Sequence, residues 1–261
     1  MKFGFIGTGV MAGAMLQSAL DKGYLQKEDV LVYDKYHPEA AERFGAEIAE
    51  NANEIAARCD VVQLGMKPQD MPAALEEIDE TLQKRKPLVI SIAAGMPLQK
   101  IAVYAPRAVR LMGNINTTVG LGMTAYCATE QVTPEELAWV KGYCECFGKA
   151  VALEERHFSA FTALAGSAPA FVYLFIDELA RAGVTAGLPK ALALEIATQT
   201  VFGSAALIKQ SSLHPYELVD RVCSPGGTTI AGINALREHG FTHAVSQAVL
   251  AAYRRDQELG K

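Results

Sequence analysis

The sequence has no surplus of positive charge. Its 24 Lys and Arg residues stand against 29 Asp and Glu residues, which gives a formal net charge of −5. Nucleic-acid binding is therefore not expected, because a protein that holds phosphates needs basic residues to neutralise them. Low-complexity tracts are also missing, and the hydrophobic content of 50% excludes intrinsic disorder. This composition is typical of a soluble globular protein.

Disulfide and metal patterns are missing as well. The five cysteines are odd in number and include no C-x-x-C, which predicts reduced thiols in a cytosol. The five histidines show no metal-ligand spacing, and neither H-E-x-x-H nor G-x-S-x-G occurs. The apolar N-terminal stretch is too short and too glycine-rich for a signal peptide. We therefore expect no metal and a cytoplasmic location.

One stretch is long enough to raise the question of a membrane span. Residues 157–176 contain no Asp, Glu, Lys or Arg, and 20 such residues can cross a bilayer. The stretch also holds several hydroxyl side chains, Gly166 and Pro169. We therefore predict a pair of helices, in the core or at an interface, broken near 166–169, rather than a membrane span.

Strand and helix patterns alternate in the first half of the chain. The pattern predicts strands at 2–7, 30–33, 60–65 and 87–92, helices at 11–22, 38–46 and 71–83, and further short strands near 108–112 and 122–127. Such alternation is typical of βαβ units with a parallel sheet. Beyond about residue 150 helical periodicity dominates. We predict an α/β Rossmann domain with a doubly wound parallel sheet at 1–153, followed by an all-helical domain at 154–261.

A glycine-rich loop follows the first predicted strand. The run Gly7-Thr8-Gly9-Val10-Met11-Ala12 has the form G-x-G-x-x-A and opens a helix. Gly7 permits a tight turn, and Gly9 lets a pyrophosphate approach the backbone at the helix N-terminus. The alternative is a glycine-rich turn without a nucleotide. Dinucleotide binding is favoured because an acidic residue also ends the second strand.

That acidic residue is Asp34, and Lys35 follows it. A carboxylate at this position can accept both ribose hydroxyls of NAD and would repel the 2′-phosphate of NADP. Lys35 could pair with that phosphate. Alternatively, Asp34 caps the helix that starts near Pro38 and Lys35 is solvated. The residues favour NAD only slightly.

Two more strand ends would point into the same crevice. In 65–69, Lys67 or the backbone beside Met66 and Pro68 could line the nicotinamide half of the cofactor. In 91–95, small residues such as Ala93 leave room for a ligand. Taken alone, the first is an ordinary strand-to-helix loop and the second also suits close helix packing.

Two segments of the helical half could hold a substrate. Residues 165–171 place small residues and a proline at a helix start, where a ligand could reach the backbone and Ser167. Residues 223–230 place two glycines and two threonines before a helix, which suits a carboxylate or a phosphate. Each could instead be a plain helix start, although the second run is longer than a cap requires.

The run Ser224-Pro-Gly-Gly-Thr-Thr229 resembles the signature of the pyrroline-5-carboxylate reductases. The glycine-rich loop, the Lys67-Pro68-Gln69 turn, 91–95 and 162–171 resemble further motifs of this family in the same order, so the resemblance covers nearly the whole chain. The chain retains Asn114 but departs from the family's usual residues at Gly65, Met66, Gly113, Ile115, Asn116, Ala165 and Ala168.

The resemblance implies reduction of a small cyclic imine, 1-pyrroline-5-carboxylate, to L-proline with NADPH or NADH. It also implies a helical domain that builds a homodimer, and dimers that associate into a larger ring. Thr229 would contact the imine nitrogen, and the carboxylate would bind Ser224 and the amides of Gly226, Gly227 and Thr228, on a loop from the partner subunit, with Ser167 nearby. The cofactor-binding residues would be Gly7, Thr8, Gly9, Val10, Met11, Asp34, Lys35, Met66, Lys67, Pro68, Ala93 and Asn114.

Two other functions remain open at this point. A β-hydroxyacid dehydrogenase would need a lysine acid/base in the helical domain, and neither Lys190 nor Lys209 stands in a small-residue motif of that kind. A nucleotide-binding protein without catalysis would find its support in the altered segment 113–116.

Overall fold

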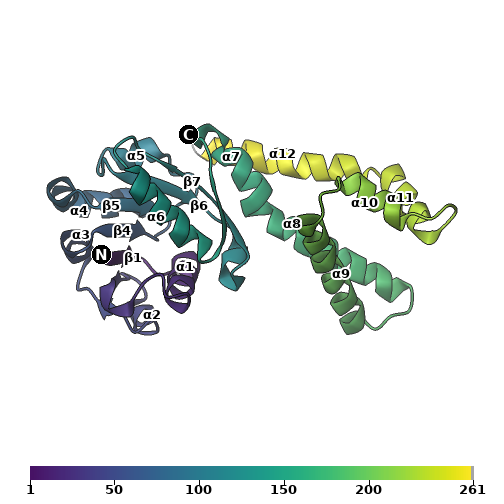
Figure 1. Cartoon of the computed structure of the whole chain (residues 1–261), viewed down its shortest axis with the longest axis horizontal. Helices are drawn as coiled ribbons and strands as arrows, with labels where there is room; N and C mark the ends of the chain where they lie inside the picture. Colours follow the sequence, from purple (N-terminus) through teal and green to yellow (C-terminus); the bar gives the residue numbers. More distant parts are fainter. Residues whose placement is uncertain (260–261) are drawn as a thin grey trace. The chain divides into compact units, whose positions relative to one another are not determined.

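The computed structural model describes residues 1–259. It divides into two compact units, and Figure 1 shows the elements of both. Unit 1 contains Met1–Gly166 together with the chain from Ala252 onward, and unit 2 is Ser167–Ala251. The predicted succession of an α/β part and a helical part is confirmed.

Unit 1 is built on one eight-stranded sheet with the order β3-β2-β1-β4-β5-β6-β7-β8. Within residues 1–259, neighbouring strands pair in parallel apart from β6 and β7, which are antiparallel. The order of the first six strands is that of the dinucleotide-binding Rossmann sheet, and it reverses between β1 and β4. The strands are β1 Phe3–Ile6, β2 Val30–Tyr33, β3 Glu47–Ile48, β4 Val61–Leu64, β5 Leu88–Ser91, β6 Ala108–Met112, β7 Gly122–Ala128 and β8 Gly148–Ala152.

Helices cover both faces of this sheet. Phe3 and Phe5 of β1 pack into one core with side chains of α1 and α6, whereas Ile6 packs into a second core with α3, α4 and α5. Burial on both faces explains why β1, β4 and β5 are almost continuously apolar. The helices are α1 Val10–Asp21, α2 Pro38–Glu42, α3 Ala52–Arg58, α4 Met71–Arg85, α5 Leu98–Ala102, α6 Pro134–Glu145 and α7 Phe158–Phe161.

Some elements of unit 1 differ from the sequence prediction. The helix predicted at 38–46 ends at Glu42, and β3, α3, α5, α6 and β8 were not predicted. A signal for α6 was present, because Thr133 and Glu136 form a reciprocal capping box ahead of this helix. β3 has only two exposed residues and therefore no periodicity to detect.

An ion pair joins the segment after β8 to the sheet. Glu155 Oε1 accepts hydrogen bonds from Arg110 Nη1 on β6 (2.8 Å) and from the backbone amide of Leu98 at the start of α5 (2.6 Å). The Arg110 guanidinium also lies 4.6 Å from the centre of the Phe158 ring. These contacts fix the 3₁₀ turn Glu155–His157 and α7 against β6 and α5.

Unit 2 consists of α-helices. These are α8 Ala168–Thr185, α9 Lys190–Gln210, α10 Pro215–Val222, α11 Thr228–Glu238 and most of α12 Phe241–Leu259. Small residues allow α8 and α9 to approach closely, because a Cβ atom at Gly183 would lie 3.1 Å from that of Ala193. Lys190 at the start of α9 donates to the Asp177 carboxylate on α8 and so joins the two helices, while Arg181 donates to the same carboxylate from within α8.

The helix break predicted near 166–169 is wrong. A π-helical turn, Thr162–Ser167, leads directly into α8, so that the helical run Glu155–Thr185 is continuous. Pro169 has no N–H to offer the Ala165 carbonyl oxygen four residues earlier, and that oxygen accepts from Asn114 Nδ2 instead. A proline therefore interrupts nothing at this position.

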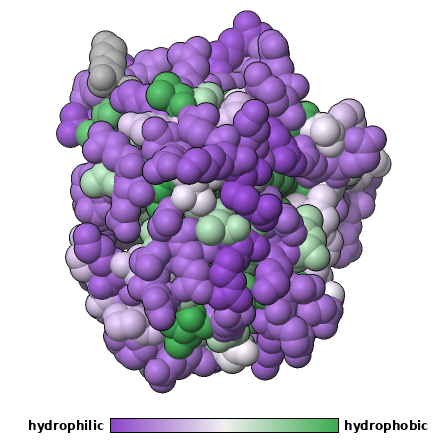
Figure 2. Space-filling view, turned by 90° about the vertical axis from the view of Figure 1, so that its left-hand side faces the viewer, coloured by the Kyte–Doolittle hydropathy of each residue, from purple (hydrophilic) through white to green (hydrophobic). Residues whose placement is uncertain are grey.

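The apolar side chains of α8 and α9 are poorly covered within one chain. By length and composition the runs Glu155–Thr185 and Lys190–Gln210 could each cross a membrane, and only 17% and 11% of their most apolar windows are buried. The face of unit 1 shown in Figure 2 is, by contrast, mostly hydrophilic with scattered hydrophobic residues. The prediction left the core and an interface open for 157–176, and this exposure argues against the core of a single chain.

Candidate functional site

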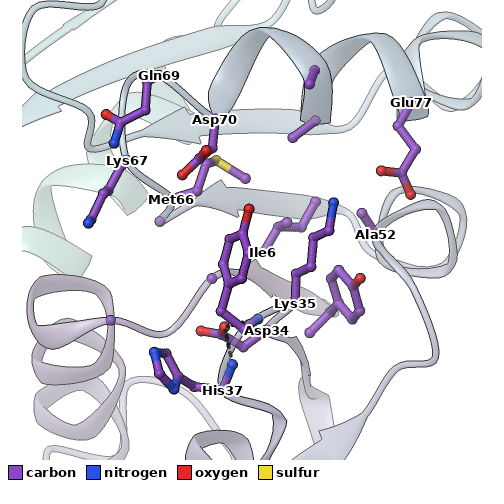
Figure 3. A pocket seen from close by; sticks show the side chains of 17 residues that line it. Ile6, Asp34, Lys35, His37, Ala52, Met66, Lys67, Gln69, Asp70 and Glu77 are labelled. Atoms are coloured by element: carbon purple, nitrogen blue, oxygen red, sulfur yellow. Dashed lines mark hydrogen bonds between the residues drawn. The ribbon is translucent and has the colours of Figure 1, made fainter.

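A cleft of about 680 Å³ lies at the carboxyl ends of β1, β2 and β4 (Figure 3). This is the point at which the strand order reverses, where open α/β sheets bind dinucleotides. The loops after the three strands supply most of its wall, and α3 and α4 supply the rest. The lining residues are Ile6, Gly7, Gly9, Tyr33, Asp34, Lys35, Tyr36, His37, Ala52, Gly65, Met66, Lys67, Gln69, Asp70, Ala73, Ala74 and Glu77.

The loops after β1 and β4 touch each other through their backbones. Gly7 has φ +88°, and a Cβ atom at Gly65 would collide with the carbonyl oxygen of Gly7. A Cβ at Gly9, however, would meet no other atom within 4 Å. Gly9 is also the N-cap of α1 and has no side chain to occupy the free amides of its first turn. The loop can therefore bring a pyrophosphate close to these amides, as the sequence pattern predicts.

Asp34 directly follows β2 and faces the cleft in Figure 3. Its Oδ2 accepts hydrogen bonds from the Thr8 amide (2.7 Å) and the Thr8 hydroxyl (3.1 Å). Its Oδ1 accepts from the amides of Tyr36 (3.1 Å) and His37 (3.0 Å). Partial burial raises the pKa of this carboxyl, but the hydrogen bonds from Thr8, His37 and Tyr36 outweigh burial and leave the pKa below its ordinary value. Asp34 is therefore an anion anchored by its own chain.

The predicted cofactor residues fall into two groups. Gly7, Gly9, Asp34, Lys35, Met66 and Lys67 line the cleft. The other six lie outside this lining: Thr8, Val10, Met11, Pro68, Ala93 and Asn114. Thr8 is buried beneath Asp34, and Ala93 is buried after β5. On α1, Val10 is exposed and Met11 packs against the core.

Asn114 joins two segments of unit 1 that are distant in sequence. Its side-chain Nδ2 donates to the carbonyl oxygen of Ala165 (3.1 Å), and its Oδ1 accepts from the amide of Met123 (3.2 Å). The carbonyl that it binds belongs to the π-helical turn Thr162–Ser167, and such turns are frequent at functional sites. In this arrangement both ends of the Asn114 amide are bound by the protein.

The predicted substrate residues all lie in unit 2. Ser167 is the N-cap of α8, and the turn Ser224–Gly227 leads into α11. Gly226 has φ +67°, which favours glycine, and a Cβ at Gly227 would press on the Ser224 hydroxyl. The amide of Gly227 donates to the Ser224 carbonyl oxygen (3.0 Å). Among the hydrogen bonds of residues 1–259, none joins Ser167 to the turn.

The first turn of α11 is open to an anion. Gly227, its N-cap, makes no side-chain hydrogen bond, and this turn contains no acidic residue. The amides of Thr228 and Thr229 therefore have no acceptor within the helix. Their hydroxyls stand on the same turn. This arrangement can bind a carboxylate and offer a hydroxyl beside it.

Several lining residues were missed at the level of sequence. Ala52, on α3, was missed because that helix was not predicted, and Ala73, Ala74 and Glu77 were not assigned a role on the predicted helix 71–83. Arg43 was missed too: its Nη2 donates to the Thr8 carbonyl oxygen (3.3 Å) and its guanidinium lies 4.5 Å from the Phe44 ring centre. No local motif marks these positions, which meet only in the folded sheet.

Comparisons with known proteins cover both units. The family model described as pyrroline-5-carboxylate reductase dimerisation matches residues 155–259, and that described as NADP oxidoreductase, coenzyme F420-dependent, matches residues 2–95. Relatives named pyrroline-5-carboxylate reductase include one from Synechocystis, 41% identical over 100% of this chain and 99% of its own, and one from Escherichia coli, 37% identical over 100% and 98%.

Solved structures agree with these relatives. A pyrroline carboxylate reductase from Plasmodium falciparum with NADP bound has a TM-score of 0.90 and 29% identity, and covers 100% of this chain and 98% of its own. A 1-pyrroline-5-carboxylate reductase from Streptococcus pyogenes has a TM-score of 0.88 and 37% identity, with coverage of 99% and 98%.

These similarities confirm the predicted fold class, and they confirm two expectations that the family resemblance implied: the use of NAD(P)H, and an oxidoreductase that acts on a C=N bond. The dimerisation model over 155–259 also identifies the helical half as a region of self-association. The chain belongs to the pyrroline-5-carboxylate reductase family.

Proposed function

We propose that the chain transfers a hydride from NAD(P)H to the cyclic imine 1-pyrroline-5-carboxylate and so forms L-proline. The observation that carries this function is the match to reductases of this name over the full length of the chain. The open helix start at Thr228 supports it, since this substrate carries one carboxylate and one nitrogen. Neither a β-hydroxyacid dehydrogenase nor a binding protein without catalysis is favoured by these relatives.

The cofactor supplies the hydride, and the protein supplies orientation. The amides beside Gly7 and Gly9 would hold the pyrophosphate, while Met66 and Lys67 would border the nicotinamide half. Thr8, Val10, Met11, Pro68, Ala93 and Asn114 would support this site from the positions described above. Holding the imine carbon close to the nicotinamide reduces the entropic part of the barrier.

The turn at the start of α11 would hold the substrate. Its carboxylate would bind Ser224 and the amides of Gly226, Gly227 and Thr228, and Ser167 would complete the binding site. The Thr229 hydroxyl would contact the ring nitrogen, which is basic enough to be protonated and therefore needs little acid catalysis. In this proposal the turn belongs to the partner subunit, so that activity requires the dimer.

The proposed assembly is a homodimer, and dimers would join into a larger ring. The exposed apolar runs of α8 and α9 support self-association, because a partner would cover surface that one chain leaves bare. We accordingly propose a cytoplasmic protein that binds neither membranes nor nucleic acid. The boundary between the Rossmann domain and the helical domain would lie between residues 153 and 154, and the dimerisation match that begins at residue 155 supports this position.

The test is NAD(P)H oxidation by the purified protein with three additions: pyrroline-5-carboxylate, a keto acid that serves as the oxidised partner of a hydroxyacid pair, and no substrate. Oxidation that depends on pyrroline-5-carboxylate and yields proline is expected. Oxidation with the keto acid alone, or cofactor binding without any turnover, would contradict the proposal. Light scattering on the same sample should show no active monomer at micromolar concentration.

A further inference from the structure

We propose that Asp34 is a positioning residue of the glycine-rich loop, that it does not accept the ribose hydroxyls of the cofactor, and that Lys35 distinguishes NADPH from NADH. This inference rests on the proposed function only in that the cofactor is NAD(P)H. It differs from the usual interpretation of an acidic residue at the end of the second Rossmann strand, which selects NAD through that carboxylate.

The first step is the hydrogen-bonding capacity of the carboxylate. An ionised Asp has two oxygens and about four acceptor sites, and it has no donor. Two donors from Thr8 reach Oδ2, and the amides of Tyr36 and His37 reach Oδ1. All four sites are therefore used within the chain. A ribose hydroxyl could bind Asp34 only by displacing one of these donors.

The second step is what these hydrogen bonds hold. Thr8 stands between Gly7 and Gly9, and it is almost completely buried. Asp34 binds its amide and hydroxyl from one side, while Arg43 donates to its carbonyl oxygen. The amides of residues 36 and 37 fix the turn that enters α2 at Pro38. One carboxylate thus holds together the loop that binds the pyrophosphate and the turn beside the ribose.

The third step concerns the charge that remains free at this wall. Lys35 is exposed, lines the cleft, and has no carboxylate within ion-pair distance among the described residues. Its Nζ lies 5.9 Å from the centre of the Tyr36 ring, and Figure 3 shows its side chain among the residues that line the cleft. A phosphate monoester carries about −1.5 to −2 charges at pH 7, and an ammonium is a common partner for it. Because Asp34 already accepts four hydrogen bonds from the chain, we expect Lys35 to bind the 2′-phosphate and so to set the preference between the two cofactors.

The experiment measures the dissociation constants of NADPH and NADH by calorimetry, without imine. Asp34→Ala should weaken both cofactors, because the loop that binds the pyrophosphate loses its support, and NADPH should be weakened less than NADH because the variant also loses a negative charge. Asp34→Asn keeps one acceptor oxygen and should restore part of the affinity for both. In turnover, Asp34→Asn should raise KM for both cofactors and leave kcat at saturating cofactor within about twofold.

Lys35→Gln provides the complementary measurement. It should weaken NADPH about tenfold, the usual effect of losing one hydrogen bond to a charged group, and leave NADH unchanged. The salt dependence of NADPH binding should fall as well. Lys100→Gln is the matched control, since Lys100 is exposed on α5 outside the cleft lining and should change neither cofactor.

Two results would overturn the inference. One is an Asp34→Ala variant that binds NADH at least tenfold more weakly and NADPH more tightly, which is the behaviour of a ribose acceptor. The other is an Asp34→Ala variant that binds both cofactors as the unchanged protein does. Because binding is measured without imine, failure of the proposed function would appear separately, as normal cofactor affinity without imine-dependent oxidation.

Discussion

Removal of the charge on Glu155 should destabilise unit 1. Glu155→Gln keeps the size of the side chain but takes the counter-ion from Arg110, whose side chain is only 8% exposed. Breaking a buried ion pair typically costs about 3–5 kcal/mol. The Glu155 side chain is 31% exposed, so water can replace part of its effect. We therefore expect the free energy of unfolding to fall by about 1.5–3 kcal/mol.

The neighbouring residue offers a matched control. Glu154 pairs with Arg156 at 3.0 Å, but these two side chains are 69% and 71% exposed. Exposed pairs contribute about 0–1 kcal/mol, so Glu154→Gln should change the free energy of unfolding by less than about 0.5 kcal/mol. The double variant Arg110→Met, Glu155→Gln should have a free energy of unfolding closer to that of the unchanged protein than the single variant Glu155→Gln has, because no unpaired charge then stays buried.

The assay is urea unfolding followed by fluorescence of Trp139, the single tryptophan of the chain. Its ring on α6 lies 5.6 Å from that of Phe3, so its emission reports on the core of unit 1. Protein concentration is held constant, because self-association contributes to apparent stability. Equal unfolding free energies for Glu155→Gln and Glu154→Gln, within about 0.5 kcal/mol, would refute the reasoning.

Three further predictions concern the site and the thiols. Thr229→Val should lower kcat roughly 3- to 100-fold and leave cofactor affinity unchanged, which steady-state kinetics and calorimetry can check; an unchanged kcat would remove Thr229 from the nitrogen contact. The pKa of Asp34 is lowered in the folded protein, so its ionised carboxylate stabilises the fold. This stabilisation should be complete above the ordinary Asp pKa of about 4 and should disappear as the pH falls through the lower pKa of the folded state. Unfolding curves of Asp34→Asn and the unchanged protein should therefore converge in acid and differ by a constant free energy at about pH 5–7. Burial raises the pKa of the Cys59 thiol to about 11 and that of Cys144 well above its usual range, so a thiol reagent at pH 8 should modify both only in urea; labelling of either in the folded protein would contradict the burial shown by the structure.

Much of the Rossmann sheet was predictable from short apolar runs. β2 and β6 begin and end where the hydrophobic pattern does, and the loops after β1, β2 and β4 were recognised by their glycines, Asp34 and Lys67. β8 was missed because its residues, Gly148–Ala152, are small and only partly buried, so the pattern that marks a core strand is weak. The helix break expected near Pro169 was wrong because the π-helical turn before it continues directly into α8, and Asn114 binds the Ala165 carbonyl that the proline leaves without an N–H partner.

The sequence by itself determined which residues can take part in binding: the glycines of the first loop, an acidic residue after the second strand, and the Ser224–Thr229 run. Local chemistry was sufficient for this, because each motif depends on residues that are close in the chain. Only the tertiary structure decided what Asp34 is bound to. Its donors come partly from Thr8, 26 residues earlier, and become its neighbours through the parallel pairing of β1 with β2. The pairing of Glu155 with Arg110 across 45 residues likewise depends on the packing of the segment after β8 against the sheet. Partners that are distant in sequence leave no periodic pattern, and whether a polar group is free or saturated is therefore decided only when the sheet has formed.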